Sequence, residues 1–176
     1  MAGVRAPEPE RPYGYVGPAE LYATVRPDSE GRVVRSAADL GAWLAECSPA
    51  ERAEPFTYVV GTDGWLRLAA RRSEHVACAG GRDVLAAGEM LFEPGAGCGT
   101  AVEISNQSTG YCPDLDSWTA VARALDRAGV GHPCGFTHAV VFRRCEGCGE
   151  RAIVREDDFV CVFCGGNLPE QWNLAP

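Results

Sequence analysis

The sequence predicts an α+β fold, in which an antiparallel sheet of hairpins packs with two amphipathic helices and a zinc-ribbon hairpin follows. Three patterns support this: β-compatible runs flank turn-forming residues, apolar residues recur at helical spacing in two segments, and four cysteines form two C-x-x-C pairs. The 176 residues suit one ordinary domain and a small metal module.

Three regions are expected along the chain. Residues 1–18 contain four prolines among charges and glycines, which predicts a flexible tail that buries little surface. The α+β domain is expected over residues 19–144. The zinc ribbon, with a docked C-terminal tail, is expected over residues 145–176.

The first predicted helix begins after Ser36, which has the side chain of an N-cap and is followed three residues later by Asp39. Apolar side chains then recur at the i, i+3, i+4 and i+7 spacing of one helical face. They are Leu40, Trp43, Leu44 and Cys47. Pro49 marks the expected end of this amphipathic helix.

Two hairpins predict the sheet. Residues 56–60 and 65–69 flank the turn sequence Gly-Thr-Asp-Gly, and residues 84–92 and 100–105 flank Pro-Gly-Ala-Gly. The four strands together predict an antiparallel meander.

A second helix and a last strand follow the hairpins. Asp114 or Asp116 can cap the helix, and Gly129 supplies its C-terminal stop. The apolar face of the helix comprises Leu115, Trp118, Val121, Ala122 and Leu125. Alternating side chains predict a strand at 136–143, which runs without a linker into Cys145, so we expect the zinc hairpin to pack on the main sheet.

The cysteine pairs carry the most specific signal. They are Cys145-x2-Cys148 and Cys161-x2-Cys164, with twelve residues between them and a glycine after each pair. Each pair can form a knuckle that turns two sulfurs toward one tetrahedral ion, and residues 150–155 and 159–163 predict the strands of a connecting hairpin. Two disulfides are the alternative. We expect one Zn²⁺, and it should be structural because four thiolates leave no open coordination position.

Composition excludes several function classes. The net charge is −8 and no lysine occurs, so Schiff-base chemistry and a P-loop lysine are excluded. From residue 145 onward two arginines face six acidic residues, and four thiolates around one divalent ion add further negative charge. Such a surface repels phosphates, so nucleic-acid binding is the weakest hypothesis; it would need Arg71, Arg72, Arg143 and Arg144 on one face.

The expected compartment is the cytosol. The chain shows no leading apolar run of signal-peptide type and no stretch near the roughly 20 apolar residues that span a bilayer, so no membrane is expected as a partner. An odd count of nine cysteines also favours a reducing compartment.

The middle of the chain carries two unusual strings, one from Glu74 to Glu89 and one from Ser105 to Pro113. Over about residues 56–130 they resemble a module of plant calmodulin-binding proteins with an IQ motif and of related fungal and bacterial proteins. The matching residues are Ala79-Gly80-Gly81, Ala87-Gly88, Ser108, Tyr111 and Pro113. The likeness implies a fold and a cleft. Glu-His-Val replaces the His-Ser-Ser of that module, Ser-Thr-Gly-Tyr replaces its Ser-Gly-His-Tyr, and no IQ motif is present, so calmodulin binding is not implied.

Polar side chains of these strings form a candidate ligand cleft, since loops on a rigid scaffold often carry binding sites. The set comprises His75, Glu89, Asn106, Ser108 and Tyr111. In an enzyme, His75 or Glu89 would act as general acid or base, and Asn106 or Tyr111 would donate to a developing charge. The alternative is that these residues form turns and complete the core.

The leading hypothesis is a cytosolic zinc-binding protein that acts as a protein- or small-ligand-binding module, and the main alternative is an enzyme built on that cleft. Two features stay open. A second metal site could use Cys112, His132, Cys134 and His138, although their spacing is irregular. Trp172 lies in a proline-containing tail and either folds over the zinc hairpin or anchors a partner.

Overall fold

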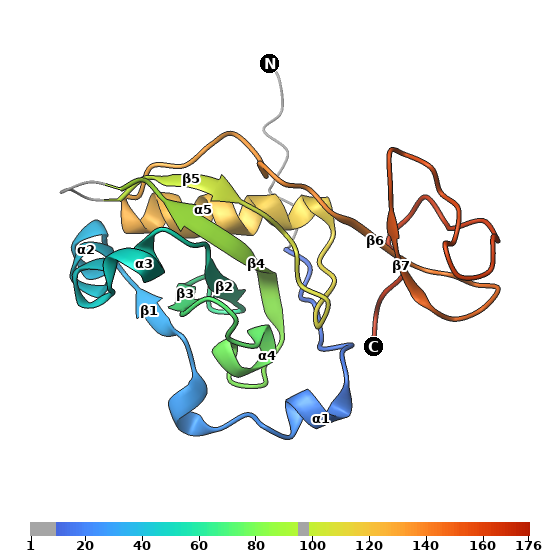
Figure 1. Cartoon of the computed structure of the whole chain (residues 1–176), viewed down its shortest axis with the longest axis horizontal. Coiled ribbons are helices and arrows are strands. Elements are labelled where there is room, and N and C mark those ends of the chain that lie inside the picture. Colours follow the sequence, from blue (N-terminus) through green and yellow to red (C-terminus); the bar gives the residue numbers. More distant parts are fainter. Residues whose placement is uncertain (1–9, 95–98) are drawn as a thin grey trace, which may run out of the picture.

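The computed structural model describes residues 10–94 and 99–176, and it has the predicted α+β architecture (Figure 1). A five-stranded antiparallel sheet has the order β1-β3-β2-β4-β5, and a separate antiparallel pair joins β6 and β7. The strands are β1 (Arg32–Val34), β2 (Phe56–Gly61), β3 (Leu66–Ala69), β4 (Val84–Phe92), β5 (Ala101–Ile104), β6 (Val141–Arg144) and β7 (Arg151–Val154).

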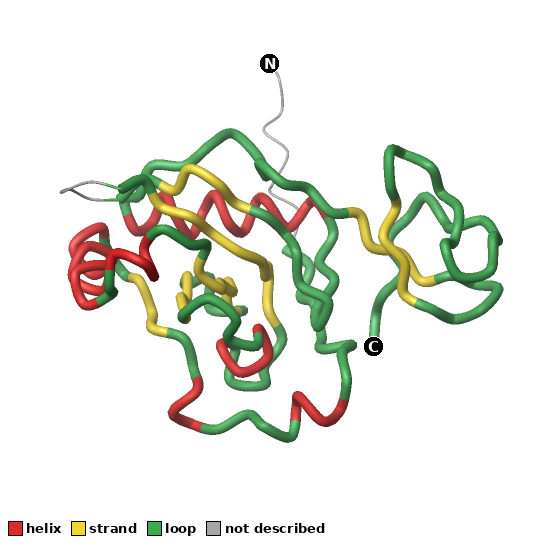
Figure 2. Tube along the Cα trace, in the orientation of Figure 1, coloured by secondary structure: helices red, strands yellow, loops and turns green. Residues whose placement is uncertain are grey.

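Among the described residues, two helices are of ordinary length and three are single turns, as the tube in Figure 2 shows. The helices are α1 (Ala19–Tyr22), α2 (Ala37–Glu46), α3 (Pro49–Arg52), α4 (His75–Cys78) and α5 (Trp118–Ala128), with 3₁₀ turns η1 (Pro27–Ser29) and η2 (Leu115–Ser117). No helix in 10–94 or 99–176 is long and apolar enough to cross a membrane.

The two predicted hairpins are confirmed, although their connection is not a meander. β4 pairs with β2 and not with β3. The outer edge of β3 is already occupied by β1, in the register Val33 to Arg67, so the next strand must add at the other edge. The expected turn residues 95–97 lie outside the described part of the chain.

Both predicted helices are confirmed, but the expected cap of the second is wrong: neither Asp114 nor Asp116 caps α5, which begins after Ser117 without a side-chain cap, and Leu115 lies in η2. Ser36 Oγ accepts the backbone N–H of Asp39 at 3.1 Å, as an N-cap should, and Gly129 closes α5 with a φ of 69°. Pro49 does not simply end the first helix; it opens α3. There Ser48 and Glu51 exchange side-chain and backbone hydrogen bonds in a capping box, with proline at the first helical position.

The five-stranded sheet buries both faces. One face, with Tyr58 and Val60 at its centre, packs against α5 and α2. The opposite face, with Val59, packs against α4 and against two tyrosines from distant segments, Tyr13 and Tyr111. Successive residues of β2 point to opposite faces, so a strand buried on both sides reads as a continuous apolar run.

The segment before α1 differs from the expected tail. Tyr13 is 1% exposed and exchanges two backbone hydrogen bonds with Val84, at 2.7 and 3.0 Å. Tyr13 therefore anchors this segment to the start of β4, and the Val16 N–H adds a hydrogen bond to the Gly110 carbonyl at 2.7 Å, despite the surrounding prolines. Residues 1–9 of the expected tail are outside the described residues.

The predicted strand at 136–143 is only partly correct. β6 begins at Val141, and earlier residues touch the sheet through one parallel bridge, between His138 and Ser105. The Thr137 N–H donates to the Ile104 carbonyl at 2.9 Å, and Thr137 Oγ1 accepts the Ile104 N–H and donates to the same carbonyl, so the contact centres on one residue and no ladder follows. The prediction failed because residues 137–139 are exposed, so their alternation does not reflect two buried faces.

Candidate metal centre

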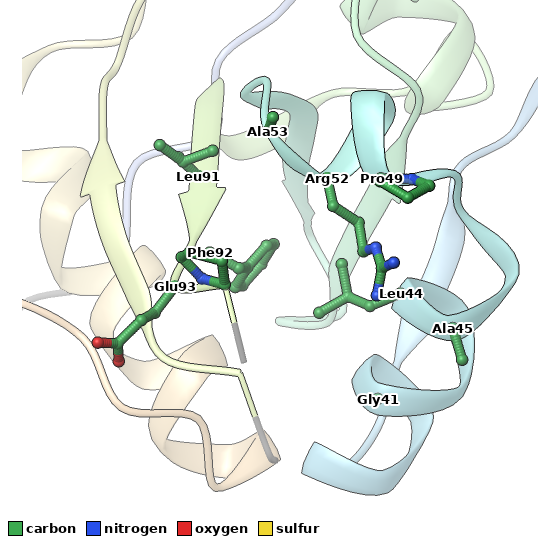
Figure 3. A pocket seen from close by; sticks show the side chains of 10 residues that line it. Gly41, Leu44, Ala45, Pro49, Arg52, Ala53, Leu91, Phe92 and Glu93 are labelled. Carbon is green, nitrogen blue, oxygen red and sulfur yellow. The ribbon is translucent and has the colours of Figure 1, made fainter. Parts of the chain in front are cut away.

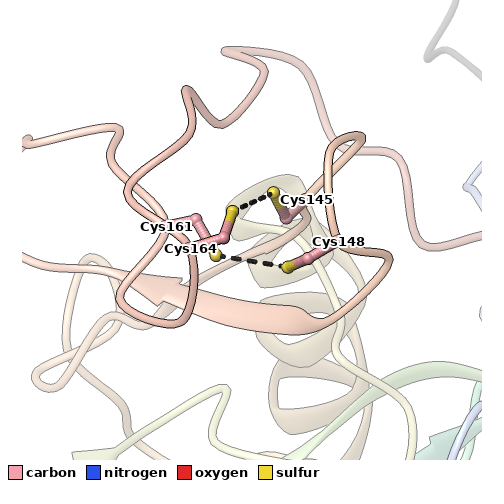
Figure 4. A group of neighbouring side chains, drawn as sticks. All are labelled: Cys145, Cys148, Cys161 and Cys164. Carbon is pink, nitrogen blue, oxygen red and sulfur yellow. Dashed lines mark hydrogen bonds between the residues drawn. The ribbon is translucent and has the colours of Figure 1, made fainter.

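The four cysteines of the C-x-x-C pairs converge, as predicted, into one cluster (Figure 4). All four sulfurs lie within 4.8 Å of one another. Cys145 Sγ lies 3.6 Å from Cys164 Sγ, and Cys148 Sγ lies 3.7 Å from Cys161 Sγ. Each close pair joins a cysteine of the first knuckle to one of the second, so both knuckles face a common centre.

These distances fit a tetrahedral zinc ion. With Zn–S near ~2.3 Å, a regular tetrahedron places its sulfurs about 3.8 Å apart. A disulfide would instead hold two sulfurs about 2.05 Å apart. Cys145, Cys148, Cys161 and Cys164 are all free thiols and their sulfurs point inward, so the residues present suit one tetrahedral ion with four soft ligands.

The two knuckles have the same backbone geometry. In the first, the Gly149 N–H donates to the Cys145 carbonyl at 2.8 Å; in the second, the Gly165 N–H donates to the Cys161 carbonyl at 2.8 Å. Both glycines have a positive φ, 78° and 73°, a conformation that costs other residues energy. The glycines after each pair are therefore structurally required.

The strand pairing around the knuckles differs from the predicted hairpin. We expected residues 150–155 to pair with 159–163, whereas β7 pairs with β6, from Val141 opposite Val154 to Arg144 opposite Arg151. The first knuckle is itself the turn of this hairpin. The C-x-x-C spacing predicts a ligand pair, but it does not indicate that the same residues connect two strands.

The backbone also favours the thiolate form of Cys145. The N–H groups of Cys148 and then Gly147 point to the Cys145 sulfur and lower the pKa of that thiol to about 7. Thiolate, and not thiol, is the form that binds a metal ion. The pKa values of Cys148 and Cys164 in the same cluster are raised, so an ion that binds all four sulfurs as thiolates must displace protons.

The C-terminal tail fixes this ribbon to the α+β domain. The Trp172 indole N–H donates to the Cys112 carbonyl at 2.8 Å, and its ring meets Tyr13 edge-on at 5.2 Å. Leu174 is fully buried beside Phe142 and Cys112. Trp172 thus packs at the junction, between Tyr13 of the domain and the cluster that contains Phe142 of β6.

Arg143 strengthens the same junction. It is 6% exposed, donates to the carbonyls of Pro169 and Glu170, and lies 3.5 Å from an Asp114 carboxylate oxygen. Arg71 is likewise paired, with Glu54 at 2.9 Å. One arginine of each doublet proposed for nucleic-acid contact therefore has a structural partner.

The five candidate cleft residues are not linked to one another by side-chain hydrogen bonds, apart from a turn bond between the Tyr111 N–H and Ser108 Oγ at 3.3 Å. Asn106 is fully buried and binds the backbone of Pro113 and Val140. Tyr111 is fully buried and donates to the Arg82 carbonyl at 2.7 Å.

His75 and Glu89 were also expected to line the cleft. His75 Nε2 donates to the Gly88 carbonyl at 2.9 Å, and burial lowers the pKa of the ring. Glu89, on β4, receives no side-chain hydrogen bond from the described residues. None of these five residues lines either of the two described cavities. The polar groups of the four residues other than Glu89 serve the fold, and no buried side-chain nitrogen or oxygen in 10–94 or 99–176 lacks a partner.

The second metal site is not assembled in the described residues. The quartet of the two C-x-x-C pairs is the one group there with metal-ligand geometry. Cys112 is buried, whereas Cys134 is exposed. His132 binds the Asp126 carboxylate at 3.1 Å and stacks edge-on against Trp118.

Sequence reasoning missed two surfaces that the structure reveals. Val162 and Phe163, between the ligands of the second knuckle, are exposed, and a groove opens between α2, α3 and β4. The first could have been noticed as an apolar pair inside a C-x-x-C turn. The second depends on how distant elements meet and has no local signal. Comparison with protein-family models, curated proteins and solved structures gave no match, so the resemblance to the calmodulin-binding module stays a prediction.

Proposed function

We propose that this protein is a zinc-stabilised binding module whose ribbon presents an apolar surface to a protein partner with a basic rim. The observation that carries the proposal is the exposure of Val162 and Phe163, at 66% and 63%. They occupy the two positions between Cys161 and Cys164. An ion held by those cysteines would fix both apolar side chains on a rigid loop.

Zinc is the ion that suits this site best. Four thiolates arranged as a tetrahedron favour zinc over harder ions that prefer oxygen ligands. The coordination sphere would be complete, so the ion would contribute folding free energy and no chemistry. The proposal therefore assigns catalysis to no residue of the ribbon.

Exposed apolar groups of this size favour a protein partner. We call Val160, Val162 and Phe163 the knuckle patch; Val160 is 39% exposed. Buried aromatic and aliphatic anchors contribute most of the binding free energy at interfaces, and exposed apolar patches often mark such sites. The patch lies on a loop whose backbone the metal would hold, which reduces the ordering cost on binding.

The negative charge of the ribbon favours a basic protein as the partner. The ribbon has two arginines and six acidic residues from Cys145 onward, a net charge of −4, and a zinc tetrathiolate adds −2. This field attracts basic proteins and repels phosphate backbones. We therefore favour a pocket framed by lysine or arginine over nucleic acid.

The test compares capture by the wild-type protein with capture by Val162→Ser/Phe163→Ser. The matched control is Val102→Ser, since Val102 is also exposed, at 38%, but lies on β5. All three proteins are first checked for equal zinc content. We expect one partner to be captured by the wild type and by the control but not by the knuckle variant. The purified partner should bind the purified wild-type protein directly, and more weakly at high salt.

The proposal fails if no capture depends on the knuckle patch. It also fails if the purified partner binds the knuckle variant as tightly as it binds the Val102→Ser control. Binding that strengthens with salt would contradict the basic rim, and sedimentation that shows self-association through Phe163 would assign the patch to a second copy of the chain.

A further inference from the structure

An apolar groove lies at the end of the molecule opposite the ribbon, where α2 and α3 meet the end of β4 (Figures 1 and 3). Its volume is about 940 Å³. Leu44 from α2 and Leu91 and Phe92 from β4 supply much of its apolar wall. A concave apolar site of roughly 300–1,000 Å³ is typical of small-molecule binding and larger than ordinary packing leaves open.

One cation points into this groove. In Figure 3 the Arg52 side chain extends from α3 toward Leu44, whereas the Glu93 carboxylate points away from both. Neighbouring Arg32 and Arg71 pair with glutamates at 2.9 Å, but Arg52 has no carboxylate within 4.0 Å among residues 10–94 and 99–176. A guanidinium at the edge of apolar surface matches a ligand carboxylate, which it can bind through two parallel hydrogen bonds.

Gly41 supplies an independent argument. A glycine inside a helix costs about 1 kcal/mol relative to alanine. A Cβ placed on Gly41 would meet no heavy atom within 4 Å, so no neighbour in the described structure excludes a side chain there. Gly41 lines the groove. The residue that weakens α2 is therefore one that keeps the groove open, and such local exceptions often mark functional positions.

We propose that the groove binds an amphiphilic carboxylate, a small molecule with an elongated apolar body and one carboxylate group. The body would lie against Leu44 and Phe92, and the carboxylate would pair with Arg52. A single cation beside a long apolar wall suits one anionic head group better than a peptide, whose many backbone groups would need partners there. The inference does not depend on the function proposed for the ribbon.

The experiment titrates the zinc-loaded full chain with dodecanoate and follows backbone amide chemical shifts. We expect saturable shifts at Gly41, Ala45 and Leu91. Dodecanol should bind more weakly, and dodecyltrimethylammonium should bind weakest. Arg52→Gln should weaken dodecanoate about tenfold and leave dodecanol unchanged.

A second pair of variants tests the groove itself. Gly41→Leu should fill it and abolish the shifts, whereas Ala42→Leu places the same side chain at an exposed position of α2 that does not line it. The inference is wrong if dodecanoate gives no saturable shifts, if Gly41→Leu binds as the wild type does, or if Arg52→Gln affects all three probes equally. It is also wrong if the ligand-free groove shows contacts from residues 95–98 or shifts that depend on protein concentration, because the chain or a second copy would then fill it.

Discussion

Asn106 shows how a polar side chain can look functional in sequence and yet serve the fold. Its amide donates to the Pro113 carbonyl at 3.0 Å and to the Val140 carbonyl at 2.7 Å, and it accepts the Val140 N–H at 2.7 Å. All its hydrogen-bonding groups are engaged inside the protein. The side chain therefore joins the loop after β5 to the segment that leads into β6.

Asn106→Ala should lower the free energy of unfolding by about 3 kcal/mol, because it leaves buried backbone groups without partners. Urea unfolding measures the change. Gln107→Ala is the control, since the Gln107 side chain is exposed and should matter by less than about 0.5 kcal/mol. A loss as small as that of the control would show that water replaces the amide.

His75 links the stability of the fold to pH. Burial lowers the pKa of its ring, and the donated bond to the Gly88 carbonyl raises it by less. The unfolded chain, with a histidine pKa near ~6.5, therefore binds a proton more readily than the folded one. Stability is then complete above pH ~6.5 and falls as the pH drops below that value, by at most about 1.4 kcal/mol per pH unit.

His75→Gln should remove this dependence. Between pH 7.5 and 5.5 the wild type should lose more unfolding free energy than His75→Gln does, and His138→Gln, at an exposed position, should behave as the wild type. Any loss of metal with acid affects all three proteins and cancels in the comparison. Equal pH dependence in all three would contradict a partly buried neutral ring.

At the scale of elements, the crossing of β4 and the loop after β5 depends on Gly88. A Cβ built there would lie 2.0 Å from the Ser105 carbonyl oxygen, which is backbone and cannot move aside alone. Tyr58, on the neighbouring strand, donates its hydroxyl to the same carbonyl at 2.8 Å. The glycine allows the chain to pass close to the sheet.

Gly88→Ala should therefore destabilise the protein by about 3 kcal/mol or more, by the mechanism of overpacking. Gly41→Ala is the contrasting variant. It should stabilise the protein by about 0.5–1 kcal/mol, because a helix gains a better residue in open space. Thermal unfolding measures both, and a neutral Gly88→Ala would mean that the close approach is absent in solution.

Sequence patterns predicted the elements that have strong local signals. α2 and α5 have periodic faces and caps, and the hairpin of β2 and β3 has a turn sequence between apolar runs. β1 was missed because three residues carry no period, and the β2 to β4 pairing was missed because order within a sheet is set by which edges are free. Strand partners depend on distant segments, which local patterns do not encode.

The candidate site residues also differ in how well a local sequence pattern predicts them. The cysteine spacing predicted the quartet, because two knuckles of fixed length bring four sulfurs together whatever surrounds them. The cleft residues were grouped only by their chemistry. Ser108 shows the difference: it is 1% exposed, and its hydroxyl caps a turn by accepting the Tyr111 N–H.

At the scale of the whole molecule, the two proposed binding surfaces lie at opposite ends. The groove is formed by α2, α3 and β4, and the ribbon stands beyond β6 and β7 (Figure 1). The core clusters of the sheet contain no ribbon cysteine, and the cluster around Cys145 and Cys161 contains no residue of the five-stranded sheet. The two parts meet in the junction cluster of Cys112, Phe142 and Leu174, which contains none of the four metal-ligand cysteines, so the sheet should not depend on the metal.

Removal of metal by a chelator should release the ribbon and leave the sheet folded. Amide hydrogen exchange should accelerate over residues 145–168, whereas β2 and β4 should stay protected. The physical reason is that metal binding supplies the folding free energy of a segment whose own apolar core is small. Loss of protection throughout the sheet would show instead that the ribbon is required for the whole fold.

We expect one zinc ion to be bound by the four cysteines and by no other ligand. Zinc-edge X-ray absorption of protein loaded with one equivalent of zinc measures the ligands of the ion. The spectrum should show a single shell of four sulfurs near ~2.3 Å, with no nitrogen or oxygen ligand. Fewer sulfurs, a nitrogen or oxygen ligand, or protein that does not retain one equivalent of zinc would contradict it.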